Sequence, residues 1–167
     1  MRQISESYKI GNYHGISIEC WSIKDLVGLR TLLQKENCPK SENLFTDEDK
    51  AVELDEVQRR ISQKRHASKM SSADILLHVN RNKLLLCDAK YKLKKLENLD
   101  RKEISKKLND SKAIIVSDFS YVQYFYLLVP KKLTDSLHLS LLKRMIAQNP
   151  NWKIVDTEQF KSLFETN

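Results

Sequence analysis

Asp74, Asp88 and Lys90 are the residues of this sequence best suited to chemistry. They lie in the stretch SSADILLHVNRNKLLLCDAKYKLKK, whose two apolar runs predict strands over 73–79 and 83–91. Acids are uncommon inside apolar strands unless they have a partner or bind a metal. The three side chains therefore indicate either a cation-binding site or a structural ion pair.

The turn between the two runs decides whether the acids meet. The break at 80–82 reads Asn-Arg-Asn, and Asn tolerates the left-handed conformation that hairpin turns require. A three-residue loop pairs Val79 with Lys83, and the same register places Asp74 directly opposite Asp88. The lysine two residues further on then shares their face. A two-residue loop would instead turn Asp74 toward the other face.

A divalent cation is the partner that two facing carboxylates favour. Unpaired, they would repel each other and raise one pKa, whereas Mg²⁺ or Mn²⁺ removes both penalties. We expect Asp74, Asp88 and the carbonyl of Ala89 to supply oxygen ligands. Lys90 would orient water, deprotonate it or neutralise a phosphoryl transition state, and the sequence leaves these three roles open. The plain alternative is that Asp74 ends a turn and Asp88 pairs with Lys90.

The charge distribution indicates a polyanionic partner. The net charge is +7, and the segment 81–113 holds eleven basic residues against five acids. Such a concentration suits nucleic acid, and the alternative is a solvated lysine-rich surface. The lysines that we expect to contact phosphates are Lys92, Lys94, Lys95, Lys102 and Lys106.

The remaining patterns predict one mixed α/β domain over residues 1–167, with a mixed sheet flanked by helices. An acidic start and a basic end predict a helix over 47–65 capped by Thr46. Apolar spacing predicts a helix over 98–110 and a buried strand over 113–118, which would lie parallel to the second strand of the hairpin.

The same sequence carries little that indicates a membrane or an oxidising compartment. No apolar run is long enough to span a bilayer, and the first ten residues lack the apolar core of a signal peptide. The three cysteines are scattered, as is usual for reduced thiols. We therefore expect a cytoplasmic protein without membrane contact, and the sequence leaves a homodimer open.

The motif residues resemble those of the PD-(D/E)XK superfamily, the restriction-endonuclease-like nucleases. The resemblance rests on SAD at 72–74 followed by CDAK at 87–90, and it covers about 47–118. It implies that Asp74 and Asp88 bind Mg²⁺, that Lys90 is the catalytic lysine, and that the core is αβββαβ. Ala73 stands where the family usually has Pro.

Many members of this superfamily carry a further glutamate on the first helix. Helical spacing places Glu53 at the boundary of the buried stripe and Glu56 toward water, so Glu53 is our candidate and Glu19 is in reserve. The first core strand stays open, because HASKMSS, before Asp74, is a poor strand and GISIECW lies upstream of both helices.

The sequence thus predicts a metal-dependent nuclease that hydrolyses phosphodiester bonds of DNA. The alternative is a non-catalytic module on the same fold that binds nucleic acid or a protein.

Overall fold

The computed structural model describes residues 7–164, whose main sheet contains seven strands. Six follow the order β2-β3-β4-β5-β8-β9, and β7 pairs with β5. The strands are β2 (Val27–Gly28), β3 (Lys50–Glu53), β4 (Ile75–Val79), β5 (Lys83–Ala89), β7 (Ser120–Tyr121), β8 (Phe125–Leu128) and β9 (Trp152–Val155). Neighbours are antiparallel from β2 to β5 and parallel from β5 to β9. The predicted mixed sheet is confirmed.

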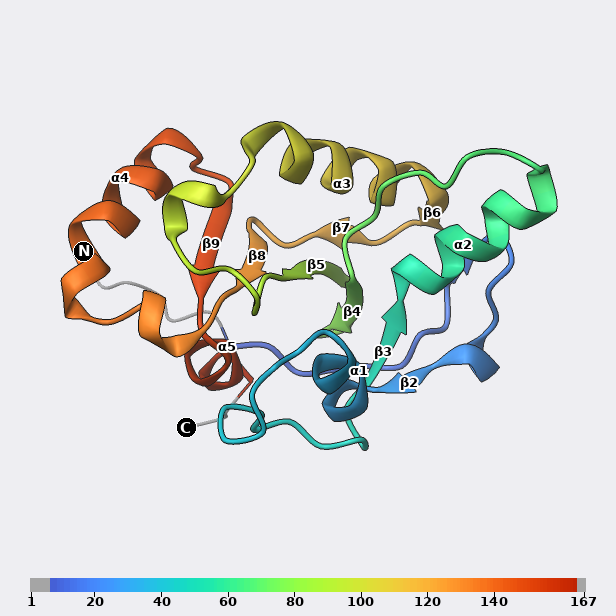
Figure 1. The fold of residues 1–167 in the computed structure, drawn as a ribbon. Coiled ribbons are helices and arrows are strands. Elements are labelled where there is room, and N and C mark those ends of the chain that lie inside the picture. The colour runs from blue at the N-terminus through green and yellow to red at the C-terminus, as the bar shows by residue number, and fades with distance from the viewer. Residues whose placement is uncertain (1–6, 165–167) are drawn as a thin grey trace.

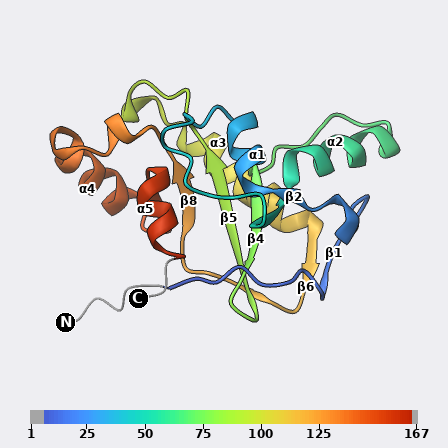
Figure 2. The same ribbon diagram turned by 90° about the horizontal axis from the view of Figure 1, so that it is seen from below.

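Helices cover both faces of this sheet (Figures 1 and 2). The α-helices are α1 (Leu29–Lys35), α2 (Leu54–Arg65), α3 (Arg101–Ile114), α4 (Leu139–Gln148) and α5 (Thr157–Ser162). Short 3₁₀ turns are η1 (Ile23–Asp25), η2 (Leu96–Asn98), η3 (Lys131–Leu133) and η4 (Ser136–His138). In Figure 1, α3 and α4 lie above the sheet, and α1 and α5 lie below it.

Strand alternation separates two hydrophobic cores, one on each face. On β5, Leu84 and Leu86 pack in the core that includes side chains of α2, α3 and α4. Leu85 and Cys87 pack in the other core, with α1 and α5. The sheet is thus buried on both sides, which explains why the sequence of β4 and β5 is continuously apolar rather than alternating.

The predicted hairpin register is confirmed. Val79 pairs with Lys83, and Ile75 pairs with Cys87. Asn80 adopts the left-handed conformation, with φ 58°, as a turn residue in a three-residue loop can. Continued by one residue beyond Ile75, this register brings the position before β4 across from the end of β5, where the two acids lie.

The predicted helix over 47–65 is wrong in its first part. Residues 50–53 form β3, and α2 begins only at Leu54. Asp47, before β3, interacts with another helix: its carboxylate accepts hydrogen bonds from the backbone N–H and the hydroxyl of Thr31, in the first turn of α1. An acid stabilises the N-terminus of any helix that lies close enough, including one earlier in the chain. This tertiary contact makes the local pattern misleading.

The strand predicted over 113–118 is also displaced. The helix before it runs on to Ile114, and β6 (Ile115–Ser117) pairs antiparallel with β1 (Ile16–Ile18) in a separate two-stranded sheet. The parallel neighbour of β5 is β8 instead. Helix α3 still lies between β5 and its parallel neighbour in the chain, but β6 and β7 come between α3 and β8.

The order of elements around the hairpin is α1, β3, β4, β5, α3, β8, with α2 inserted between β3 and β4. The strand that pairs with β4 on the side away from β5 is β3. Neither of the two segments that the sequence offers lies there, because HASKMSS forms no strand and GISIECW contains β1 of the separate sheet. Within residues 7–164, every helix is too short or too polar to cross a bilayer. The predicted absence of a signal-peptide core concerns the first ten residues. Residues 1–6 of that stretch lie outside the described residues.

Candidate active site

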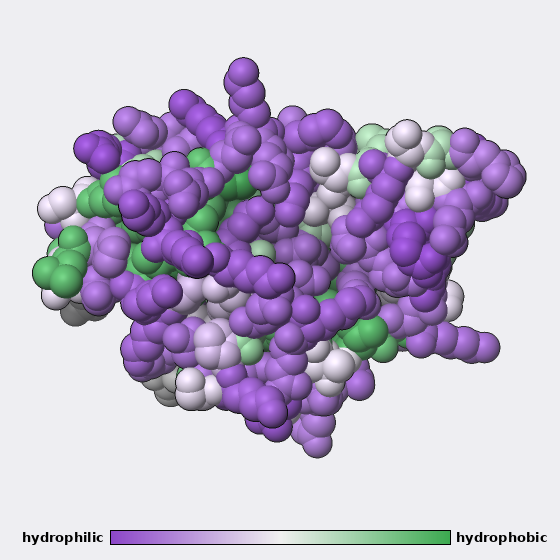
Figure 3. Space-filling model, viewed as in Figure 1, coloured by the Kyte–Doolittle hydropathy of each residue, from purple (hydrophilic) through white to green (hydrophobic). Residues whose placement is uncertain are grey.

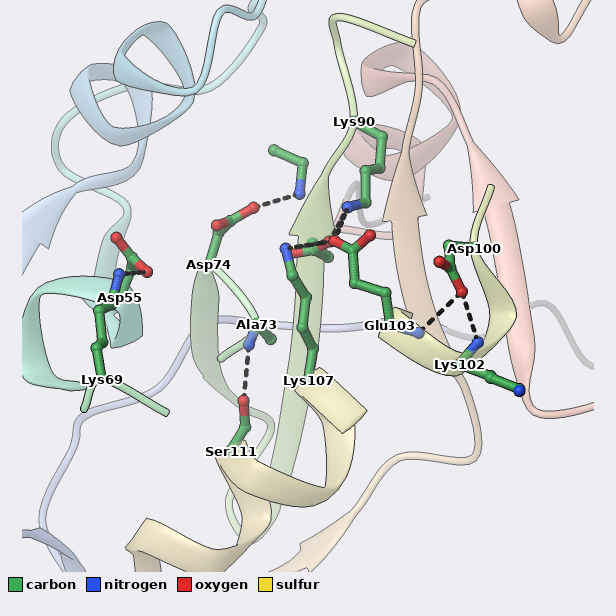
Figure 4. A network of polar contacts seen from close by, with 12 residues as sticks. Asp55, Lys69, Ala73, Asp74, Lys90, Asp100, Lys102, Glu103, Lys107 and Ser111 are labelled. Carbon is green, nitrogen blue, oxygen red and sulfur yellow. Dashed lines mark hydrogen bonds and ion pairs between the residues drawn. The ribbon is translucent and has the colours of Figure 1, made fainter. Parts of the chain in front are cut away.

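Two aspartates meet at one edge of the sheet, where β5 ends and β4 begins. Asp88 is fully buried in β5, and Asp74 is 9% exposed just before β4. The backbone N–H of Ala89 donates to Oδ2 of Asp74 at 2.7 Å. On the preceding residue, the N–H of Ala73 donates to Oγ of Ser111 on α3 at 2.7 Å, as Figure 4 shows. These backbone contacts fix the Asp74 carboxyl group beside Asp88.

Asp74 is protonated at neutral pH because of this neighbourhood. Burial, followed by the charge of Asp88 and hydrogen bonding with it, raises the pKa of Asp74 to about 8. The charge of Glu36 adds to the rise, and the N–H of Ala89 opposes it. Asp88 faces the ammonium groups of Lys90 and Lys107, which both lie 3.2 Å from its Oδ2. The predicted raised pKa is confirmed.

Lys90 follows β5 and turns back toward the acids, as the two-residue spacing predicts. Its Nζ lies 3.2 Å from Oδ2 of Asp88 and 3.2 Å from Oε1 of Glu103 on α3 (Figure 4). Burial lowers the pKa of Lys90, but the charge of Asp88 and the hydrogen bonds to Asp88 and Glu103 outweigh burial and raise it to about 12. At neutral pH Lys90 is therefore a cation, and a role as general base is disfavoured.

Helix α3 contributes two further site residues, Lys107 and Glu103, that sequence reasoning missed. Nζ of Lys107 lies 3.3 Å from Oδ1 and 3.2 Å from Oδ2 of Asp88. Glu103, one turn earlier, lies 3.6 Å from Lys107. The sequence does indicate the position of Lys107, because it lies three residues after the helix anchor Ile104. This spacing puts both side chains on the helix face turned to the sheet.

Glu53 does not join the two aspartates. It is the last residue of β3 and the N-cap of α2, not a helix residue as predicted. Its strand position shares a face with Ala51, which packs in the core on the α1 side. Its carboxylate forms an ion pair with Lys35 at the end of α1. The reserve candidate, Glu19, is likewise held in ion pairs with two basic residues of α2.

Glu36 is a carboxylate at this edge that the sequence did not indicate. It is the C-cap of α1 and is half-buried. Burial, followed by the charges of Asp55, Asp88 and Glu53, raises its pKa. The charges of Glu36 and Asp74 also act on each other. No local motif marks this residue, because only the tertiary fold brings the end of α1 to the sheet edge.

The donor set suits a cation that needs few protein ligands. Among the described residues, no group of three or more His, Cys, Asp or Glu side chains is arranged to hold a metal ion. Asp74 and Asp88 still offer two carboxyl groups in contact with each other, which are hard oxygen ligands. The proton on Asp74 occupies the place where a cation would bind. Mg²⁺ commonly uses one or two carboxylates and completes its shell with water and phosphate oxygens. The Ala89 carbonyl remains a predicted additional ligand.

The five lysines predicted to contact phosphates are all exposed and flank this edge. Lys92, Lys94 and Lys95 follow β5 in the loop to η2, and Lys102 and Lys106 lie on α3. The surface over β5 and α3 is mainly hydrophilic, whereas hydrophobic side chains gather around α4 (Figure 3). The lysines therefore form a basic rim on the loop after β5 and on α3, where Lys106 is paired with Asp110.

Comparison of the chain with protein-family models, curated proteins and solved structures finds no match in any of the three. The class of protein must therefore be inferred from the geometry of this site.

Proposed function

We propose that the protein is a divalent-metal-dependent phosphodiesterase acting on nucleic acid, with DNA the favoured substrate. The observation that carries this proposal is the buried contact between Asp74 and Asp88, in which Asp74 keeps its proton until a cation replaces it. Lys90, two residues after Asp88, adds the cation that the PD-(D/E)XK resemblance implies at this position. The basic rim supplies contacts to phosphates on either side of the bond to be cut.

Each residue of the site has a distinct task in this proposal. A bound divalent cation would polarise a phosphoryl oxygen and lower the pKa of a water molecule. Asp74 and Asp88 would hold the cation, and Asp74 would release its proton to do so. Lys90 would neutralise the negative charge that develops on phosphorus. In the net reaction, water forms one P–O bond, another P–O bond breaks, and a proton of the water ends on the departing oxygen.

Replacing Lys90 tests the role of its charge. We expect Lys90→Met to lower the rate of DNA cleavage by about 10²–10³-fold, as loss of a charge-stabilising donor does. Lys90→Arg should recover part of that rate, because Arg is also a cation at neutral pH. Both variants should still bind Mn²⁺ in calorimetry, since Asp74 and Asp88 remain. Cleavage by Lys90→Met at the wild-type rate would exclude Lys90 from the reaction.

A second candidate function is a nucleic-acid-binding module without catalysis. It is favoured by the state of Asp88, whose charge is already balanced by the ammonium groups of Lys90 and Lys107 without any metal. This candidate predicts DNA binding, no cleavage and no heat on titration with Mg²⁺ or Mn²⁺. Binding to a protein partner and formation of a homodimer stay predictions of the sequence.

The basic rim makes a prediction that both candidate functions share. We expect the triple change of Lys92, Lys94 and Lys95 to Gln to weaken DNA binding, measured by fluorescence anisotropy in EDTA. The slope of log affinity against log salt concentration should become shallower by about 0.9 for each phosphate that the variant no longer neutralises. The control changes three exposed lysines on other segments, Lys24, Lys40 and Lys143. Equal slopes in all three proteins would show that the rim does not bind DNA.

A further inference from the structure

Lys107 places an ammonium group against both oxygens of the buried carboxylate. Its Nζ lies 3.3 Å from Oδ1 and 3.2 Å from Oδ2 of Asp88. Lys90 approaches Oδ2 from the end of β5 at 3.2 Å. Asp88 is 0% exposed, and the side chain of Lys107 is 20% exposed. One buried carboxylate therefore has two cationic partners, of which the motif accounts only for Lys90.

Glu103 keeps this second ammonium in position. Its Oε1 lies 3.6 Å from Nζ of Lys107, one helical turn later, and 3.2 Å from Nζ of Lys90. Lys90 thus comes from the end of β5, and Glu103 and Lys107 come from α3. Helix α3 is anchored to the sheet by Ile104, which is fully buried. A helix anchored in this way holds Lys107 in place at low cost in side-chain entropy.

The formal charges indicate how many metal ions the site accepts. Six charged side chains contribute: Asp74, Asp88, Glu36, Glu103, Lys90 and Lys107. When the four carboxyl groups are ionised, these side chains carry a total charge of −2, which one divalent cation brings to zero. A second divalent cation would leave an excess of two positive charges around a buried carboxylate, which is strongly unfavourable.

We propose that Lys107 is a built-in second cation, so that the site binds a single divalent metal ion. Two-metal phosphodiesterases place two ions about 3.5–4 Å apart to neutralise both sides of the reacting phosphate. In this chain the ammonium of Lys107 occupies the side of Asp88 that faces α3 and supplies the charge of the second ion. The inference rests on the proposed function, because it presupposes that the aspartates bind one ion.

Titration with Mn²⁺ alone, followed by calorimetry, tests the proposal on the full chain. We expect one ion per wild-type chain and two per chain in Lys107→Met, because the change frees Oδ1 of Asp88 and leaves a charge of −1 at the site when a single ion is bound. The matched control is Lys112→Met, an exposed lysine in the last turn of α3 whose ammonium lies over the ring of Tyr121, and it should leave one ion. Lys107→Gln, which keeps a hydrogen-bond donor, serves as a second variant if Lys107→Met does not fold.

Electron paramagnetic resonance locates the second ion in the same samples. Two Mn²⁺ ions about 4 Å apart interact magnetically, so Lys107→Met should lose the six-line spectrum of isolated Mn²⁺ that the wild type gives. Two ions in the wild type would overturn the proposal. One ion in the wild type and one ion in each Lys107 variant would also overturn it. The last result leaves the proposed function intact, whereas a wild-type chain that binds no ion refutes both.

Discussion

Asp88→Asn is expected to abolish metal-dependent cleavage of DNA, with a decrease of about 10³-fold or more in rate. The change removes an ionised oxygen ligand and the anion that holds Lys90 and Lys107 together. The rate is measured in Mg²⁺ and in Mn²⁺ on duplex and single-stranded DNA. Loss of an electrostatic group in a buried site typically costs 10²–10³-fold, and loss of a metal ligand adds to that.

The same substitution also acts on stability, so the fold needs its own control. Leaving the partly buried ammonium groups of Lys90 and Lys107 without this carboxylate costs up to about 3–5 kcal/mol of unfolding free energy. The control is Asp110→Asn, because Asp110 is also followed by Lys two residues later but pairs with Lys106 on the surface of α3. We expect this variant to keep full activity. A folded Asp88→Asn protein that cleaves DNA within tenfold of the wild-type rate contradicts the proposed site.

Asp74→Asn is expected to change how the stability of the metal-free protein depends on pH. The pKa of Asp74 is about 8 in the folded protein, whereas an aspartate in an unfolded chain has a pKa of about 3.9. Between these values the folded state holds a proton that the unfolded state has released. The contribution of Asp74 to the unfolding free energy therefore falls as pH rises, by up to about 1.4 kcal/mol per pH unit. Asn, which carries no titrating proton, removes this contribution.

Denaturant unfolding in EDTA at pH 5, 6, 7, 8 and 9 measures the effect. The unfolding free energy of the variant, relative to that of the wild type, should increase at each step in pH. This difference should level off above pH 8. Mg²⁺ or Mn²⁺ should stabilise the wild type more strongly as pH rises toward 8, because the cation replaces the proton of Asp74. Parallel stability curves for the two proteins would show that Asp74 does not hold the proton.

The hairpin and its acids could be predicted because their determinants are local. The turn at Asn80 and the apolar runs on either side fix the register, and the register alone places Asp74 opposite Asp88. Spacing of two residues along a strand likewise predicts that Lys90 returns to the same face. The mixed α/β class follows from the same periodic patterns.

The other parts of the site depend on contacts between distant segments. The acids at 47–49 resemble a helix start, which places Glu53 in a helix on sequence alone, although Asp47 binds α1 instead. Glu36 reaches the sheet edge through the packing of α1. No pattern in the neighbouring sequence predicts this position. Lys107 had a local signal in its position on α3, but its contact with Asp88 depends on where α3 crosses the sheet.

The most direct test of the metal site is anomalous diffraction from crystals grown with Mn²⁺ at pH 8, where Asp74 can release its proton. The proposed function predicts one anomalous peak per chain between the carboxylates of Asp74 and Asp88, at about 2.0–2.3 Å from one oxygen of each. Lys90 and Lys107 should remain beside Asp88. The contrary result is a well-ordered crystal with no anomalous peak between the two aspartates, grown at a Mn²⁺ concentration at which the protein cleaves DNA in solution. That result would contradict the metal site.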